Sequence, residues 1–266
     1  MVGKEEANTE GQQQIHPSFL RTMEQKNGIT SKLAGIKHKI GIYSAKGGVG
    51  KTTVAVNLAY TLNDMGYRVG LLDADVDTPN VNLFLGINSV GNAEYPLKPI
   101  DKDGVKVIST AMFLDDQKKP IIWRGPIVGK MIYEFLGETA WGELDYLIID
   151  LPPGTSDAPL SIMQLLKMDG FILVTTPQRI AAVNAIRSGM MARRMGISVL
   201  GVIENMSGDR PRGAEEVAKE MDCRMLGAVR HDGRMSELSD KGLVPVKEDK
   251  EIGRTFTEIA KKIAEA

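Results

Sequence analysis

A glycine-rich segment that ends in a lysine and two threonines is the part of the chain best suited to phosphate chemistry. Residues 44–53 read Ser-Ala-Lys-Gly-Gly-Val-Gly-Lys-Thr-Thr and lie between a short apolar run, 40–43, and a segment of helical composition, 51–65. Glycines let backbone N–H groups approach phosphate oxygens, and the N-terminus of the following helix faces their negative charge. The pattern predicts a phosphate-binding loop.

The residues of this loop have separate expected roles. Lys51 is expected to reach the β- and γ-phosphates of a nucleotide, and the Thr52 hydroxyl to bind Mg²⁺. The predicted nucleotide-binding residues of the loop are Lys46, Gly47, Gly48, Val49, Gly50, Lys51, Thr52 and Thr53. A glycine-rich turn without a ligand is the alternative, which the flanking strand and helix patterns disfavour.

Acidic residues follow two further apolar runs. Asp73 and Asp75 come after one run, and Asp150 ends another. Next to bound phosphates, a carboxylate can orient the attacking water or hold the metal ion. We assign Asp75 to the water and Asp150, with Thr52, to Mg²⁺; a solvated acidic turn and a strand end are the respective alternatives. Gly154 is expected to offer a backbone N–H to the γ-phosphate.

An amide side chain follows a third run. Asn205 comes near the end of the segment Val-Ile-Glu-Asn-Met, 202–206, and can bond an adenine edge as both donor and acceptor. The turn Arg-His-Asp at 230–232 follows the next run. It either flanks the base or is an ordinary surface turn.

All these candidates lie at the ends of short apolar runs, which alternate with segments of helical length. The runs lie at 40–44, 69–73, 105–109, 146–150, 171–175, 199–204 and 225–229. The helical segments are expected at 51–65, 126–138, 159–168, 180–195, 213–221 and 251–266. The alternation predicts a three-layer α/β/α fold with a mainly parallel central sheet, which binds ligands at the carboxyl ends of its strands.

Composition and charge set the class of protein. The chain has 266 residues, of which 42% are hydrophobic, and a formal net charge of −1, so neither nucleic acid nor an acidic membrane is an expected partner. It has no apolar run long enough to cross a bilayer and no signal-peptide pattern. A single cysteine, Cys223, excludes an intramolecular disulfide. We expect a cytoplasmic protein.

The chain divides into two regions by composition. Residues 1–35 are polar and are expected to form a mobile tail, and residues 36–266 a single P-loop ATPase domain. Residues 86–103 hold Gly, Pro, Asn and Asp and are expected to be a long surface connection. The amphipathic segment 251–266 is expected to pack against the domain rather than bind lipid.

The phosphate loop departs from the usual pattern at two positions. Ala45 stands where glycine is usual, and a second lysine, Lys46, follows it. This arrangement resembles the deviant Walker A loop of the ParA/MinD/Mrp group of dimeric ATPases. The resemblance implies that Lys46 reaches across a dimer interface to the partner's nucleotide, so that Lys46, Lys51 and Asp75 are the expected catalytic residues.

Several further segments resemble the Mrp/ApbC-type iron–sulfur cluster carrier ATPases. They lie at 73–75, 79–80, 124–126, 150–157 (Asp-Leu-Pro-Pro-Gly-Thr-Ser-Asp), 174–178 and 204–207 (Glu-Asn-Met-Ser). The resemblance covers residues 38 to about 260. It implies a homodimer that binds and slowly hydrolyses ATP with Mg²⁺ while it passes an iron–sulfur cluster to client apoproteins, with Arg124 near the dimer interface.

The chain departs from that family in its thiols. Members commonly carry a Cys-x-x-Cys pair shortly after Glu-Asn-Met-Ser, whereas residues 207–213 here read Ser-Gly-Asp-Arg-Pro-Arg-Gly. Two such pairs would supply the four thiolates of a bridging cluster. Cys223 is more typical of a small buried residue than of a cluster ligand. A cluster would need non-protein ligands, a partner's ligands, or Cys223 with another group.

Two other functions stay open. A spatial-organisation ATPase like MinD or ParA would share the Lys46 and Lys51 loop, but it would need a basic surface or a lipid-seeking helix. A cluster-free regulatory module that binds ATP to dock a partner would need no thiols, and the missing cysteine pair motivates it.

Overall fold

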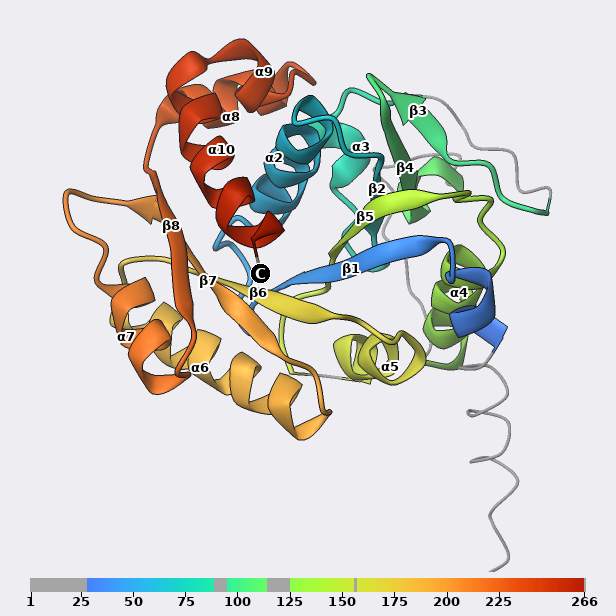
Figure 1. Cartoon of the computed structure of the whole chain (residues 1–266), viewed down its shortest axis with the longest axis horizontal. Helices are drawn as coiled ribbons and strands as arrows, with labels where there is room; N and C mark the ends of the chain where they lie inside the picture. Colours follow the sequence, from blue (N-terminus) through green and yellow to red (C-terminus); the bar gives the residue numbers. More distant parts are fainter. Residues whose placement is uncertain (1–27, 89–94, 114–124, 156, 266) are drawn as a thin grey trace, which may run out of the picture.

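The computed structural model describes residues 28–88, 95–113, 125–155 and 157–265, with the backbone alone at 113, 125–130, 157 and 158. Its centre is one eight-stranded sheet in the order β3-β4-β2-β5-β1-β6-β7-β8 (Figure 1). The strands are β1 (Ile36–Tyr43), β2 (Val69–Asp73), β3 (Ile100–Lys102), β4 (Val105–Ser109), β5 (Leu144–Asp150), β6 (Gly170–Thr175), β7 (Val199–Ser207) and β8 (Arg224–Arg230). Every neighbouring pair is parallel except β3 and β4.

Helices cover both faces of the sheet, which confirms the predicted three-layer fold (Figure 1). One face carries α2 (Lys51–Asp64), α3 (Val81–Phe84), α8 (Gly233–Asp240), α9 (Pro245–Glu248) and α10 (Lys250–Ala264). The other carries α4 (Gly125–Gly137), α5 (Asp157–Leu165), α6 (Arg179–Arg194) and α7 (Gly213–Glu220). A 3-10 turn, η1 (Thr110–Phe113), follows β4. Over the described residues, no helix is both long and apolar enough to cross a membrane.

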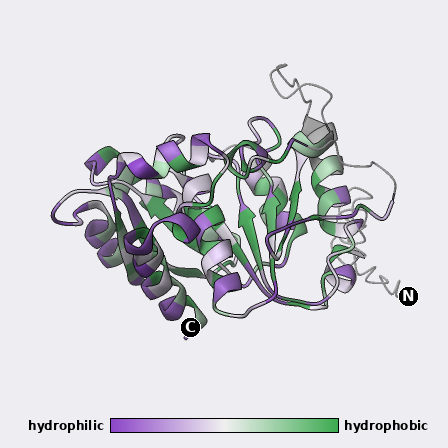
Figure 2. Ribbon diagram, turned by 90° about the horizontal axis from the view of Figure 1, so that it is seen from above, coloured by the Kyte–Doolittle hydropathy of each residue, from purple (hydrophilic) through white to green (hydrophobic). Residues whose placement is uncertain are grey.

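The two helical layers explain why the strands read as nearly continuous apolar runs. In β5, Leu147 and Ile149 belong to the core under α4 to α7, whereas Tyr146 and Ile148 belong to the core under α2 and α10. A strand covered on both faces has no solvent-facing side, so its sequence does not alternate. Figure 2 shows the result as hydrophobic strands inside and hydrophilic residues on the outer helices.

The structure corrects the limits of the predicted tail. Residues 28–32 are helical, and Ile29 and Leu33 are 0% and 2% exposed in the core under α4. The tail boundary at residue 35 is therefore wrong, because 28–35 pack as part of the domain. The remainder of the predicted tail, 1–27, lies outside the described residues.

The structure also corrects the expected surface connection at 86–103. This segment contains β3 and the buried side chains of Ile87 and Leu97. A three-residue strand is too short to show a pattern in the sequence. For the same reason α3 and α9, of four residues each, were not predicted. The polar helix α8 was missed because Met235 is the only one of its residues that is buried.

Candidate nucleotide-binding site

The loop between β1 and α2 has the open backbone that a phosphate site requires. Gly48 and Gly50 have positive φ angles of 79° and 83°, a region that favours glycine. At Gly47 and Gly48 no heavy atom lies within 4 Å of the place where a Cβ would stand. Gly50 is the N-cap of α2 and no side chain caps the helix, so its first N–H groups are available to an anion.

Asn205, at the end of β7, holds this loop from the side. Its Nδ2 donates to the Val49 carbonyl oxygen at 3.0 Å, and a Cβ at Gly50 would lie 2.1 Å from that nitrogen. A Cβ at position 50 would therefore displace the Asn205 amide from Val49, in addition to the cost of a positive φ. The residue predicted to read the base is therefore also bound to the phosphate loop.

The structure brings four of the predicted site residues together beside the loop: Lys51, Thr52, Asp75 and Asp150. The Thr52 hydroxyl donates to Asp150 Oδ2 at 2.5 Å. Burial raises the pKa of Asp150 to about 6, although Lys51 and Thr52 oppose the shift. Burial also raises the pKa of Asp75, and Lys51 again opposes it. The amine of Lys51 therefore acts on both carboxylates.

One carboxylate oxygen of this cluster has no partner among the residues that the structure describes. Asp150 Oδ1 is buried and accepts no hydrogen bond from them. A free buried carboxylate oxygen beside a threonine hydroxyl fits Mg²⁺, which prefers oxygen ligands and keeps several waters. The described residues contain no group of three or more His, Cys, Asp or Glu able to hold a metal ion. Phosphate and water would therefore supply the other ligands.

Asp75 is held in place by the turn that follows it. Its two oxygens accept hydrogen bonds from the backbone N–H and the hydroxyl of Thr78, each at 3.1 Å. Its own backbone N–H donates to Asp73 Oδ1 at 3.2 Å. The carboxylate thus has a fixed position at the carboxyl end of β2.

Asp73 has a structural role that the sequence did not indicate. Its Oδ2 accepts hydrogen bonds from the Val81 N–H at 3.1 Å and the Ser109 hydroxyl at 3.0 Å. It is fully buried, and burial followed by the charge of Asp150 raises its pKa well above the ordinary range. Asp73 joins β2, β4 and α3, and so sets the direction of the turn that carries Asp75.

The position of Gly154 differs from the expectation. Its backbone N–H donates to the Ser44 carbonyl oxygen at 3.2 Å, and its own carbonyl oxygen accepts from the Tyr43 hydroxyl at 2.7 Å. The N–H expected to face a γ-phosphate is therefore bound to the end of β1 in this structure. Burial raises the pKa of Tyr43 to about 12, so the hydroxyl keeps its proton and remains a donor.

Glu204 is a second residue whose role the sequence did not reveal. It is fully buried, and its Oε2 accepts hydrogen bonds from the Gly213 and Ala214 N–H groups at 2.7 and 3.0 Å. Its Oε1 accepts from the Ser207 hydroxyl at 2.6 Å. A carboxylate at these N–H groups stabilises the start of α7. An acid inside an apolar run was the available signal.

A cavity of about 250 Å³ adjoins the loop. It is lined by Thr53, Phe84, Asn205, Met206, Arg230, His231, Asp232, Met235, Ser236, Ser239 and Asp240. The structure thus brings the predicted turn 230–232 next to Asn205, in the lining of one cavity beside the loop.

The cluster beside the loop does not include three other sequence candidates, Lys46, Cys223 and Arg124. Lys46 is exposed, and its carbonyl oxygen accepts from the Ser44 hydroxyl at 2.8 Å. Cys223 is half-buried and directly precedes β8, so it lies at the amino ends of the parallel strands, whereas the loop lies at their carboxyl ends. Burial raises the pKa of its thiol. Arg124 lies outside the described residues.

Comparison with known families agrees with this geometry. The ParA family model described as NUBPL iron-transfer P-loop NTPase matches residues 35–264. The chain belongs to this family. An iron-sulfur cluster carrier protein of Methanocaldococcus jannaschii is 44% identical over 91% of this chain and 89% of its own length. The protein of that name from Aquifex aeolicus is 39% identical over 88% and 69%.

Solved structures of this fold contain nucleotides. A nucleotide-binding protein from Archaeoglobus fulgidus in complex with ADP aligns with a TM-score of 0.73 and 35% identity, covering 84% of this chain and 94% of that one. The septum site-determining protein MinD of Pyrococcus horikoshii, complexed with Mg-ADP, aligns with a TM-score of 0.65 and 26% identity, covering 85% and 96%. This family of P-loop NTPases therefore shares the architecture seen here.

Proposed function

We propose that the protein binds ATP with Mg²⁺, hydrolyses it slowly, and acts as an iron–sulfur cluster carrier or assembly factor. The nucleotide part rests on one observation: the unpartnered Asp150 Oδ1 lies beside Thr52, next to a glycine loop that is open to a phosphate. The iron–sulfur part is supported by the family and by the names of the relatives.

The residues of the site have distinct roles in this mechanism. Lys51 and the N–H groups of the loop neutralise and orient the phosphates, and Asp75 orients the attacking water. Thr52 and Asp150 would hold Mg²⁺, which when bound neutralises the charge that develops on the phosphates. Phosphoryl transfer needs little covalent chemistry from a protein, so fixed positions are the main contribution of these side chains.

We further propose a homodimer that closes over its nucleotides at the carboxyl edge of the sheet. The exposed Lys46 would enter the partner's site, as an arginine finger does. Light scattering after size exclusion should show a monomer without nucleotide and a dimer with Mg-ATP, most clearly for Asp75→Asn, which slows hydrolysis. A monomer under every condition would contradict this arrangement.

The chain does not contain a four-thiolate site for the cluster that it would carry. It has one cysteine, and both Cys223 residues of such a dimer would lie at the edge of the sheet far from the closed face. The thiolates would have to come from a client protein or a small thiol. After anaerobic reconstitution with iron and sulfide, we expect the wild type and Cys223→Ser to bind equal amounts of iron and equal amounts of sulfide. Loss in the variant would identify Cys223 as a ligand.

Calorimetry with Mg-ADP tests the nucleotide proposal. We expect binding by the wild type, weaker binding without Mg²⁺, and strong loss in Lys51→Ala. Lys37→Ala is a matched control, because Lys37 is an exposed lysine that pairs with Asp145 at the opposite edge of the sheet. No heat of binding from the wild type would overturn the proposal.

The thiol count also favours a second candidate, the cluster-free regulatory ATPase. Transfer from a preformed cluster donor to an apoprotein separates the two functions. Acceleration by this protein supports the carrier, and no acceleration with intact ATP turnover supports the regulator. The MinD-like alternative gains no support from α10, whose apolar residues Ile252, Phe256, Ile259 and Ile263 are buried in the domain.

A further inference from the structure

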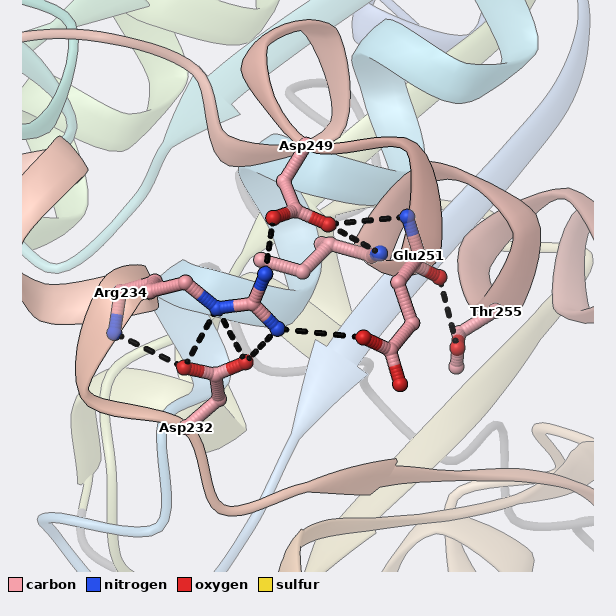
Figure 3. A network of polar contacts seen from close by, with 6 residues as sticks. Asp232, Arg234, Asp249, Glu251 and Thr255 are labelled. Carbon is pink, nitrogen blue, oxygen red and sulfur yellow. Dashed lines mark hydrogen bonds and ion pairs between the residues drawn. The ribbon is translucent and has the colours of Figure 1, made fainter.

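One arginine joins the first turns of α8 and α10 (Figure 3). Arg234 Nε donates to both oxygens of Asp232, at 3.1 and 2.9 Å, and one terminal nitrogen donates to Glu251 at 3.2 Å. The other terminal nitrogen pairs with Asp249. A single guanidinium thus holds three carboxylates, two of which belong to the segment that starts α10.

Both aspartates also cap the helices that Arg234 connects. Asp232 Oδ1 accepts from the Arg234 N–H at 2.9 Å at the start of α8. Asp249 Oδ1 accepts from the Glu251 and Ile252 N–H groups at 2.8 and 3.1 Å at the start of α10. Because caps fix the direction in which the chain enters a helix, the arginine fixes the two helix starts relative to each other.

This network begins at one wall of the cavity beside the phosphate loop. Asp232 lines that cavity, and both of its carboxylate oxygens accept hydrogen bonds from Arg234. The ion-pair partners of the guanidinium are the three carboxylates of Asp232, Asp249 and Glu251. Without Arg234, three carboxylates would lie close together, and their repulsion would move the turn at 230–232.

A second set of hydrogen bonds links α9, which directly precedes α10, to the same cavity. The Val246 N–H, in α9, donates to Asn57 Oδ1 at 3.1 Å, and Asn57 Nδ2 donates to the Thr53 carbonyl oxygen at 2.8 Å. Asn57 is fully buried in α2, and Thr53 lines the same cavity as Asp232. The Arg234 network therefore connects two lining residues of the cavity, Asp232 and Thr53, through the segment from α9 to the start of α10.

We propose that Arg234 is a positioning residue for the nucleoside part of the bound nucleotide. It holds the Asp232 turn at the separation from Thr53 that admits a nucleoside, while the phosphates are held by residues 46–53. This inference rests on the proposed nucleotide function and deepens it. Arg234 acts through Asp232 and makes no contact with the phosphate loop in the described structure.

The test compares a ligand that has a nucleoside with one that has only phosphates. Calorimetry would give the Kd of Mg-ADP and of magnesium with inorganic triphosphate for the wild type and for Arg234→Gln. We expect the variant to bind Mg-ADP about three- to tenfold more weakly, the range of one broken ion-pair network, and to bind triphosphate as the wild type does.

Two further variants complete the design. Arg234→Lys keeps the charge without the fork that bonds three partners, so it should recover only part of the Mg-ADP affinity. Arg254→Gln removes an exposed arginine on α10 that has no ion pair among the described residues, and it should bind both ligands normally.

The outcomes separate the two proposals. Equal weakening of Mg-ADP and triphosphate in Arg234→Gln would show a general loss of structure and overturn the positioning role. Unchanged affinity for Mg-ADP would overturn it as well. A wild type that binds neither ligand would overturn the proposed function itself, and a wild type that binds both leaves that function standing whatever the variants show.

Discussion

The phosphate side of the site and its nucleoside side use charge in opposite ways. Lys51, Asp75 and Asp150 are 8%, 9% and 1% exposed, and one oxygen of Asp150 has no partner. The Arg234 and Glu251 side chains are 49% and 72% exposed, and their charges are paired. Buried charges cost folding free energy, and Lys51 and Thr52 offset only part of the cost at Asp150, so the phosphate side carries a cost that a bound ligand would reduce. The nucleoside side carries no such cost.

The largest effect expected on the phosphate side is catalytic. Lys46→Ala should lower ATP turnover by about 10³-fold or more while it changes the Kd of Mg-ADP little, because a charge supplied in trans acts on the transition state. Steady-state phosphate release and calorimetry would measure the two quantities.

Mixing variants tests whether Lys46 acts in trans. In dimers of Lys46→Ala with Asp75→Asn, the first protomer keeps its own Asp75 and receives Lys46 from the second. One of the two sites in each mixed dimer is then complete, so an equimolar mixture should regain about a quarter of wild-type turnover. A mixture as inactive as its components would show that Lys46 acts within its own protomer.

Gly50→Ala should lose Mg-ADP binding and lower the free energy of unfolding by about 2–4 kcal/mol, because it adds a collision with Asn205 to the strain of a positive φ. Chemical denaturation measures the change. Gly196→Ala is the matched control: Gly196 has a φ of 74° and no atom within 4 Å of its Cβ position. Gly196→Ala should lower the free energy of unfolding by only about 1–2 kcal/mol and should still bind Mg-ADP. Equal losses of stability in the two variants would show that the contact with Asn205 adds nothing.

Asp150→Asn should stabilise the ligand-free protein at pH 8. The folded-state pKa of about 6 lies above the ordinary 3.8, so the ionised carboxylate costs folding free energy at high pH and nothing once both states are protonated. We expect a gain of about 1–3 kcal/mol at pH 8 that shrinks as the pH falls and disappears below about pH 3, where the carboxyl is protonated in both states. Denaturation at several pH values, without Mg²⁺, would measure it.

Asp145→Asn provides the opposite case. The backbone N–H of Arg68 and the side chains of Lys37 and Arg68 lower the pKa of the Asp145 carboxyl. The ionised carboxylate therefore stabilises the folded protein at pH values above its ordinary pKa, and this stabilisation is lost as the pH falls. The variant should therefore be less stable than the wild type at pH 8 and equal to it in acid. If Asp150→Asn and Asp145→Asn both stabilised the protein at pH 8, the contrast between a buried carboxylate and an ion-paired one would be wrong.

The smallest effect is expected on the nucleoside side. Glu251→Gln removes an exposed ion pair with Arg234 and should change the free energy of unfolding by about 0.5 kcal/mol or less. Urea denaturation would measure it. A loss as large as that of Gly50→Ala would show that the exposed network stabilises the whole domain.

Most of the phosphate side could be predicted from the sequence, because each of its parts is a short contiguous pattern. The loop with Lys51 and Thr52 is one segment, and Asp75 and Asp150 each end an apolar run. Asp73 and Glu204 also end or interrupt such runs, but their roles depend on backbone groups that only the fold brings near. The same holds for Gly154, whose N–H binds Ser44 instead of facing the site.

The sequence by itself determined the alternation of strands and helices, the phosphate loop and the shortage of thiols, because local spacing and composition carry that information. The tertiary structure decided which strand ends lie together. Asn205 and Val49 are 156 positions apart, and Val246 and Asn57 are 189 apart, yet each pair shares a hydrogen bond. Such contacts follow from the order of the strands in the sheet, which no local pattern specifies.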